Sequence, residues 1–477
     1  MIGTVAIHEE HETFRNELAS VAVDGRRKWV YARQPSGRYY RARTVVSWFL
    51  LAFLLLAPFV TIHHQPLMLL NVIERRFVLF GVVFWPQDFY LVVLIALTTL
   101  VTLALLTAAV GRVWCGWMCP QTIFMEMVFR KIEFLIQGSA QQQLRRDRGP
   151  WTADRVVRAG VKHAVFLTLS FALGNVFLAW IIGAGPLRAI VTDPPARHLA
   201  GLTAMLLFSA VFYGVFARFR EQACVLACPY GRVMSALIDR RTITVTYDRR
   251  RGEPRGKPLK DLADNANRPA PGDCVDCHQC VTVCPTGIDI RHGVQLECVN
   301  CTACMDACDD VMQRLDRPRG LIRLTSEDAI TAGTTHWMTG RIKAYGTLWL
   351  VLISIVSTLL FERPDIDVLV LRQPGTLFTT MTEGEVANFY SVQAFNRTAT
   401  ARTFHLEVVE PRGATITLLG KQDQVAPYSL SESRMLVHVP ASALSGTTTP
   451  IKIVVRADGV LAQKISTSFV GPGRDLP

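Results

Sequence analysis

The sequence predicts an α-helical membrane protein with five transmembrane helices, an inserted α+β module and a C-terminal all-β sandwich. Half of the 477 residues are hydrophobic, and the mean hydropathy is positive. All twelve cysteines fall into regular spacings, which indicates metal or electron chemistry. The last part of the chain contains no cysteine and alternates apolar with polar residues, as strands do.

Five uncharged stretches are each close to the length of about 20 residues that a helix needs to cross a bilayer. Their length and lack of charge argue against core helices of a globular domain. A cleavable signal peptide is not expected, because the polar residues 1–44 precede the first stretch and no small-residue cleavage site follows it. The predicted spans are Val45 to Ile62, Phe89 to Val110, Val165 to Ala184, Leu199 to Ala217 and Tyr345 to Leu360.

Arginine and lysine predict the orientation, since short loops rich in these residues stay in the cytoplasm. They are concentrated before the first span and after the second, so we expect the N-terminus inside. The net charge of +12 then reflects topology and contact with membrane lipid, and no nucleic-acid partner is predicted. We expect a multi-pass protein of a bacterial inner (cytoplasmic) membrane. The predicted domains are a cytoplasmic basic segment (1–44), four transmembrane helices (45–217), a cytoplasmic region (218–342) with a cysteine-rich module at about 265–315, a fifth transmembrane helix (343–361) and a periplasmic domain (364–477).

Eight cysteines form two runs that share the spacing C-x₂-C-x₂-C-x₃-C. This is the spacing with which bacterial ferredoxins hold 4Fe-4S clusters on four thiolates. Proline follows the first run, as in ferredoxins, whereas Asp309 follows the second. The runs are Cys274, Cys277, Cys280 and Cys284, and then Cys298, Cys301, Cys304 and Cys308.

The fourth cysteine of each ferredoxin run ligates the other cluster, and we expect the same crossing here. One predicted cluster is held by Cys274, Cys277, Cys280 and Cys308, and its neighbour by Cys298, Cys301, Cys304 and Cys284. The alternative is a pair of zinc sites, because C-x₂-C is also a zinc-ribbon spacing. Two tight quartets favour iron-sulfur clusters over the spaced pairs that zinc uses. The predicted module is therefore a two-cluster ferredoxin-like fold.

The other four cysteines form two isolated C-x₃-C-P units, one after the second span and one after the fourth. These are Cys115 with Cys119 and Cys224 with Cys228. On a continuing helix the two sulfurs of each unit would share a face, but the following proline disfavours helical geometry at the second cysteine. Four soft thiolates converging on one site would suit Cu(I), zinc or iron-sulfur chemistry. The alternative is that these cysteines are small apolar packing residues.

These strings together resemble the CcoG, FixG or RdxA family of cytochrome c oxidase accessory proteins. The resemblance rests on WCGWMCPQTIF from Trp114 to Phe124, ACVLACPYGR from Ala223 to Arg232, and the block from Cys274 to Met312. It extends to the number of spans, the basic N-terminal segment and the β-rich C-terminal extension. It therefore covers most of the chain.

The resemblance implies a polyferredoxin-like membrane protein with two 4Fe-4S clusters that acts as a cupric reductase, making Cu(I) from Cu(II) for assembly of cbb3-type cytochrome c oxidase. It assigns copper and the catalytic role to Cys115, Cys119, Cys224 and Cys228. The implied partners are a cytoplasmic electron donor and cbb3-type oxidase assembly factors or copper chaperones. Two alternatives are a quinol-linked electron-transfer adaptor for a periplasmic reductase and an assembly scaffold whose clusters are structural.

The C-terminal extension is predicted to be an immunoglobulin-like sandwich. Short alternating runs, such as Phe404 to Val409, Ile416 to Leu419 and Ile451 to Val455, are separated by turn residues. Six or seven short strands in about 110 residues suit such a fold. No catalytic constellation stands out there, so docking of a partner or passive stabilisation is expected.

Overall fold

The computed structural model describes residues 19–22, 24–256, 272–333, 338–375, 377–381, 384–419 and 424–472. The first 18 residues of the predicted basic segment and residues 265–271 of the predicted module lie outside this description. The chain divides into two compact units, each described by itself. The first unit comprises residues 1–60, 66–75 and 89–356, and the second comprises residues 61–65, 76–88 and 357–477.

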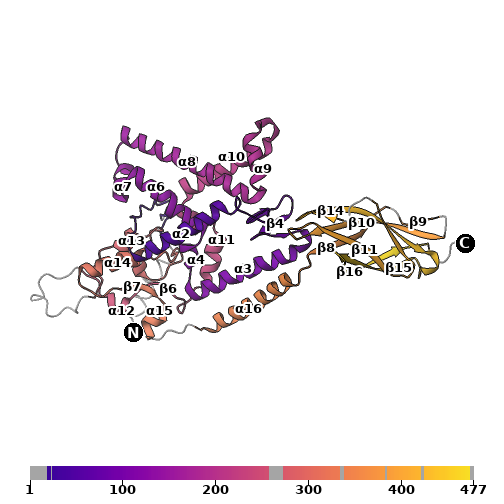
Figure 1. Cartoon of the computed structure of the whole chain (residues 1–477). Helices are drawn as coiled ribbons and strands as arrows, with labels where there is room; N and C mark the ends of the chain where they lie inside the picture. Colours follow the sequence, from indigo (N-terminus) through magenta and orange to yellow (C-terminus); the bar gives the residue numbers. More distant parts are fainter. Residues whose placement is uncertain are drawn as a thin grey trace, which may run out of the picture. The chain divides into compact units, whose positions relative to one another are not determined.

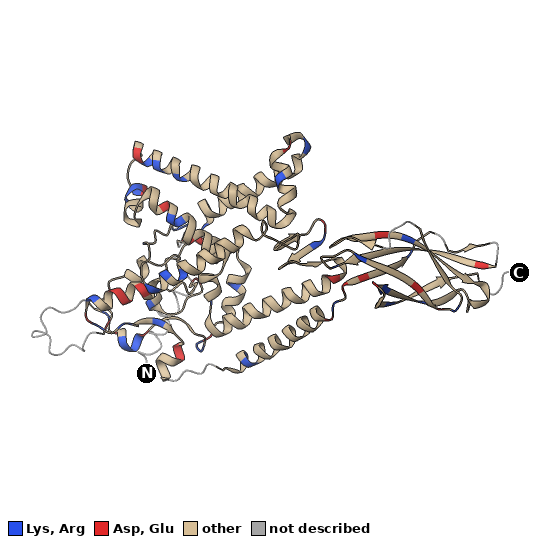
Figure 2. Cartoon of the chain, viewed as in Figure 1, with Lys and Arg blue, Asp and Glu red and all other residues tan. Residues whose placement is uncertain are grey.

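Five helices among the described residues are long and apolar enough to cross a membrane (Figure 1). Leu, Val, Ala and Phe dominate them, and the ribbon in Figure 2 is almost entirely tan along α3, with charges near the helix ends. In the first unit α8 and α10 pack side by side, and Gly174 of α8 lies directly against Ser209 of α10. The five helices are α2 (Arg38–Leu56), α3 (Phe89–Val110), α8 (Ala153–Ile182), α10 (Leu199–Gly214, extended by the π-helical turn η5, Val215–Phe219) and α16 (Gly340–Phe361).

The five predicted spans overlap these helices, but three sets of boundaries were wrong, including that of α16, which begins at Gly340 rather than Tyr345. α2 begins at Arg38 rather than Val45 and ends at Leu56 rather than Ile62, while α8 begins at Ala153 rather than Val165. A hydropathy window finds only the apolar centre of a helix, so charged first turns are missed. The start of α8 is fixed by Thr152, whose hydroxyl accepts a hydrogen bond from the Arg155 amide at 3.3 Å.

The cysteine-rich part of the first unit is a small α+β module. Two short strands, β6 (Thr244–Tyr247) and β7 (Ile322–Thr325), pair antiparallel with Val245 opposite Leu324. Two helices carry cysteines, α13 (Gln279–Thr282) and α14 (Ala303–Arg314). The buried core of the module consists of Val245, Tyr247, Ile290, Met305, Met312, Leu321 and Ile322 with cysteines among them.

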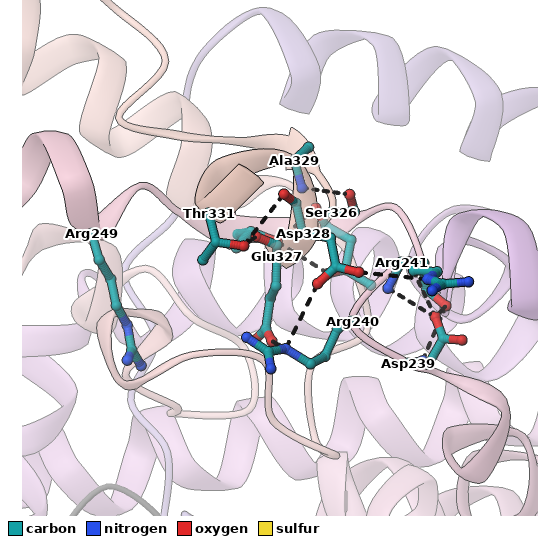
Figure 3. A network of polar contacts seen from close by, with 12 residues as sticks. Asp239, Arg240, Arg241, Arg249, Ser326, Glu327, Asp328, Ala329 and Thr331 are labelled. Carbon is teal, nitrogen blue, oxygen red and sulfur yellow. Dashed lines mark hydrogen bonds and ion pairs between the residues drawn. The ribbon is translucent and has the colours of Figure 1, made fainter. Parts of the chain in front are cut away.

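A polar network holds the end of this module in place (Figure 3). The hydroxyl of Ser326 caps α15 (Glu327–Ala332) by accepting a hydrogen bond from the Ala329 amide at 3.1 Å. The first turn of α15 presents Glu327 to Arg240 at 3.6 Å and Asp328 to Arg241 at 3.6 Å. Acidic residues are favoured at a helix N-terminus, so the Ser326 cap, the helix dipole and the two ion pairs all stabilise the first turn of α15.

The segment before α2 crosses the module and ties it to the helices of the first unit. The Arg33 amide donates to the Thr282 carbonyl at 2.8 Å, and Val30 lies against Gly287. Farther back, the Arg27 guanidinium pairs with the buried carboxylate of Glu221 at 2.8 Å. Residues 27–33, which we call the N-terminal strap, therefore contact both parts of the unit.

The second unit contains a sandwich of two antiparallel sheets, which agrees with the predicted immunoglobulin-like fold. One sheet has the order β12-β14-β10-β8 with β9 beside β10, and the other has the order β13-β11-β15-β16. Nine strands are described rather than six or seven, because the two-residue strands β9 and β13 are too short to leave a sequence pattern. The strands are β8 (Ile366–Arg372), β9 (Thr379–Thr380), β10 (Glu385–Asn396), β11 (Arg402–Glu410), β12 (Thr415–Leu419), β13 (Gln424–Val425), β14 (Leu430–Pro440), β15 (Thr448–Ala457) and β16 (Val460–Val470).

A buried ion-pair cluster lies in the same unit. Asp88 accepts from Arg397 at 2.7 Å and from Arg363, and Arg397 also pairs with Asp367 at 3.0 Å. The side chains of Asp88, Arg363 and Arg397 are all less than a tenth exposed. Residues 76–88, which the sequence analysis treated as part of a connection between two spans, thus belong to the C-terminal unit.

Candidate electron-transfer site

Four cysteines of the module line one cavity. They are Cys274, Cys277, Cys280 and Cys308, which we call the outer quartet because Cys277 is exposed. Met312, Leu321 and Ile322 supply apolar walls. The quartet combines three cysteines of the first run with the last cysteine of the second.

The remaining four module cysteines line a second cavity. They are Cys284, Cys298, Cys301 and Cys304, which we call the inner quartet. Its walls include Val245, Ile288 and Ile290, and Cys280 also borders it, so the two cavities are neighbours. The geometry therefore brings the eight cysteines together in the same two sets that the crossed-ligation rule predicts.

The two C-x₂-C-x₂-C loops share an unusual backbone. The residues before and after the second cysteine are left-handed in both: Asp276 and His278 (φ 53° each) in the first loop, Asn300 (φ 51°) and Thr302 (φ 63°) in the second. For side chains other than glycine this conformation costs on the order of 1–3 kcal/mol each, and it is concentrated at functional sites. The repeated strain indicates that both loops are shaped for the same kind of occupant.

Burial raises the pKa of the module thiols. The pKa of Cys280, Cys298 and Cys308 rises to about 12, and the pKa of Cys301 rises to about 11. In each case the main cause is that the thiolate would be desolvated. A ligand must be a thiolate, so binding of a cationic iron-sulfur core would displace these protons.

The residues fit a four-iron cluster better than a single ion. Within the described parts of the chain, no three His, Cys, Asp or Glu side chains lie close enough together to hold one metal ion. Zinc would need four ligands within about 2.3 Å of a single point. Four thiols spread around a dry cavity instead suit a larger group, so the zinc alternative is disfavoured.

The two C-x₃-C-P units have similar backbones at the second cysteine and the proline, but differ at the first cysteine. Cys115 lies in the short helix α4 (Val113–Trp117) and Cys224 in the π-helical turn η6 (Ala223–Ala227). Cys119 and Cys228 are extended N-caps, with ψ of 124° and 113°, and the proline occupies the first position of the next helix in each case. Those helices are α5 (Pro120–Ile123) and α11 (Pro229–Val233). The proline thus ends helical geometry at the second cysteine, as predicted.

The two units pack against one another. The Cys224 thiol lies beside the side chain of Thr122, which is three residues beyond Cys119. A methyl group placed on Gly231 would lie 2.5 Å from the Cys224 carbonyl oxygen and 2.9 Å from Nη2 of Arg112. Burial, together with neighbouring thiols, raises the pKa of Cys224 to about 12. The four thiols therefore lie close to one another, with Cys115 buried and the other three half-buried.

The first C-x₃-C-P unit also touches the inner quartet. A methyl group on Gly116, between Cys115 and Cys119, would lie 3.0 Å from the Cα atom of Cys301 and closer still to the Val299 carbonyl oxygen. The Trp117 indole donates to the Asn300 carbonyl at 3.3 Å. Sequence reasoning missed Gly116, although a glycine between two motif cysteines is a signal of close backbone approach.

Comparison with known proteins agrees with this site. A model of a 4Fe-4S dicluster domain matches residues 219–327, a model of a 4Fe-4S binding domain matches residues 92–138, and a model of the immunoglobulin-like fold at the C-terminus of FixG matches residues 356–472. These matches define an iron-sulfur electron-transfer protein, which also has five helices long and apolar enough to cross a membrane.

Three relatives match most of the chain. RdxA of Cereibacter sphaeroides is 35% identical over 423 residues, covering 85% of this chain and 88% of RdxA. FixG of Rhizobium meliloti is 33% identical over 433 residues, covering 83% of this chain and 82% of FixG. RdxB of Cereibacter sphaeroides is 33% identical over 425 residues, covering 86% and 87%. The chain belongs to the FixG/RdxA family.

Proposed function

We propose that this protein passes single electrons from a cytoplasmic donor to Cu(II), and that the Cu(I) formed is used to assemble a cbb3-type oxidase. Two 4Fe-4S clusters would be held by the outer and the inner quartet, where they would accept and donate one electron at a time. Copper is the substrate, and the reaction consumes one electron for each Cu(II) that becomes Cu(I).

The observation that carries the proposal is the contact between the inner quartet and the first C-x₃-C-P unit. Cys277 of the outer quartet is exposed, the two cavities share Cys280, and Cys301 of the inner quartet packs on Gly116. This sequence of neighbours supports a path from the surface of the module to the C-x₃-C-P thiols.

The C-x₃-C-P thiols have the chemistry that Cu(I) requires. Thiolates are soft ligands and favour Cu(I) over harder ions. Burial disfavours the bare thiolates of Cys115 and Cys224, so a bound cation would stabilise their charged form. We infer that Cys115, Cys119, Cys224 and Cys228 receive the copper ion, and that two of them at a time suffice to hold it.

The membrane orientation belongs to the same proposal. Arginine and lysine before α2 and after α3 favour a cytoplasmic N-terminus, which puts both quartets and the C-x₃-C-P units in the cytoplasm and the C-terminal sandwich in the periplasm. The sandwich would then be available to oxidase assembly factors or copper chaperones on that side.

Cu(II) reduction by purified protein tests the proposal. The protein is reduced with dithionite, separated from excess reductant, and mixed with Cu(II) and a chelator that is coloured only with Cu(I). We expect Cu(I) in proportion to bound iron and acid-labile sulfide. Changing all four C-x₃-C-P cysteines to alanine should abolish this reduction while the iron content stays unchanged.

Two outcomes would contradict the proposal. An unchanged rate of Cu(II) reduction in the quadruple variant would remove the copper assignment. Iron-loaded protein that is reduced by a quinol but leaves Cu(II) untouched would instead favour a quinol-linked adaptor.

A further inference from the structure

Two buried arginines near the inner quartet have no carboxylate partner. Arg43 of α2 and Arg112, at the N-cap of α4, are each 2% exposed. Among the described residues neither lies within ion-pair distance of an acidic side chain, and Nη2 of Arg43 and Nε of Arg112 have no hydrogen-bond partner. An isolated charge is costly to bury, so both guanidinium groups require a counter-charge.

Both arginines lie beside the inner quartet, and Arg112 also lies beside the Cys115 thiol of the first C-x₃-C-P unit. Nε of Arg43 donates to the Gly116 carbonyl at 2.6 Å, and Gly116 packs on Cys301. Arg112 donates to the carbonyl of Leu296, two residues before Cys298. Burial raises the pKa of both Cys301 and Cys298. Arg43 lowers the pKa of Cys301, and Arg112 lowers the pKa of Cys298. Each arginine thus favours negative charge at this quartet.

Other charges near the inner quartet compensate one another. Arg130 is buried beside Cys284, but it pairs with Glu126 at 2.9 Å and with Glu221 at 3.8 Å. Glu126 also faces Cys301 and raises the pKa of that thiol, although Arg130 neutralises the carboxylate. Arg43 and Arg112 remain as uncompensated positive charges.

The outer quartet has a different electrostatic environment. Its nearest cation, Arg291, lies between two carboxylates, pairing with Asp289 at 2.6 Å and with Asp276. Asp309 lies beside Cys308 and raises the pKa of that thiol, while Arg38 pairs with Asp309 at 3.4 Å. Positive charge here is matched or exceeded by negative charge.

We propose that Arg43 and Arg112 are the counter-charges of the inner iron-sulfur cluster and hold its reduction potential above that of the outer cluster. The inference rests on the proposed function only in requiring both clusters. A four-iron cluster on thiolates is anionic and gains one negative charge on reduction, so nearby cations stabilise its reduced form. With Arg43 and Arg112 beside the inner quartet, an electron given up by the outer quartet's cluster would be held more favourably at the inner quartet, with no proton transferred. Electrons would enter beside the exposed Cys277 and move toward the C-x₃-C-P thiols.

A redox titration of the purified full-length protein, followed by electron paramagnetic resonance, tests this assignment without copper. Cys277→Ser alters a ligand of the outer cluster and identifies its signal. We expect the other signal to titrate at the higher potential. In Arg43→Gln the midpoint potential of the inner cluster should fall by about 59 mV. For one electron this makes transfer from the outer to the inner cluster about tenfold less favourable. Arg43→Lys keeps the charge and should stay near the wild-type value.

A matched control is available on the same helix. Arg41 is exposed, and Arg41→Gln should shift neither midpoint. Arg112→Gln gives a second, independent variant, with the same expected shift of the inner midpoint. If either glutamine variant loses iron that its lysine counterpart retains, the counter-charge role is likewise supported.

Three results would overturn the inference. They are an inner midpoint at or below the outer one, glutamine variants that leave both midpoints unchanged, and lysine variants that behave like the glutamine variants. Protein that titrates as expected but leaves Cu(II) unreduced would contradict only the proposed function.

Discussion

Gly116 gives a sharp test of the packing between the C-x₃-C-P unit and the inner quartet. The substitution Gly116→Ala adds one methyl group where the neighbours are main-chain atoms: the Val299 carbonyl, the Asn300 carbonyl carbon at 3.0 Å and the Cα atom of Cys301 at 3.0 Å. Contacts this short force the loop to move, because backbone cannot rotate aside as a flexible side chain can. Overpacking of this kind typically costs about 1–3 kcal/mol, which corresponds to roughly 5- to 150-fold in the equilibrium between the packed and displaced loop.

The assay compares the rate of Cu(II) reduction by pre-reduced protein with the iron content of the same sample. We expect Gly116→Ala to slow the reduction at least tenfold and to lose part of the iron, because the strained loop carries Cys298 and Cys301. Gly160 of α8 is the matched control, since a methyl group there meets nothing within 4 Å. Gly160→Ala should leave rate and iron unchanged. A Gly116→Ala protein with wild-type rate and full iron would refute the reasoning that this contact is part of the electron path.

Two further predictions concern loading and stability. Since burial raises the pKa of Cys280, Cys298 and Cys308 to about 12, the empty thiols are protonated at neutral pH, and cluster loading must release protons. Loading measured by visible absorbance after anaerobic reconstitution should weaken as the pH is lowered; an increase toward acid pH would contradict this. Asp88→Asn leaves the buried Arg363 without that carboxylate and should destabilise the C-terminal unit by about 3 kcal/mol, at the low end for a broken buried pair because Asp367 still pairs with Arg397. Thermal unfolding checks this against Asp365→Asn, whose side chain is 68% exposed and whose loss should cost at most about 0.5 kcal/mol.

Much of the fold could be predicted because its signals are local. The spacing of the cysteine runs, the length of the apolar stretches and the alternation in β11, β12 and β15 are each contained within a short window of sequence. The helix starts at Arg38 and Ala153 were missed, because hydropathy does not register a charged turn that continues a helix. Arg43 was included in the predicted basic segment (1–44) for the same reason, whereas it is buried on α2.

The parts of the site that could not be predicted depend on contacts between distant residues. Nothing near Gly116 in the sequence indicates that residues 299–301 will pack on it, since that contact depends on how the module folds back on the helices. The seating of Asp88 among arginines from beyond α16 is likewise a product of chain topology. From the sequence alone, charged residues at these positions cannot be distinguished from the charges that set membrane orientation, because their partners are distant in the chain.

The N-terminal strap has a consequence for biosynthesis. Residues 27–33 leave the ribosome long before Thr282 and Gly287, against which they pack, so their binding surface does not exist for most of translation. The strap must remain unbound through the synthesis of four apolar helices and pack on the module afterwards. Maturation of the iron-sulfur module should therefore be sensitive to changes near the start of the gene, far from the codons of its cysteines, and fusions placed ahead of the strap are expected to delay its packing on the module.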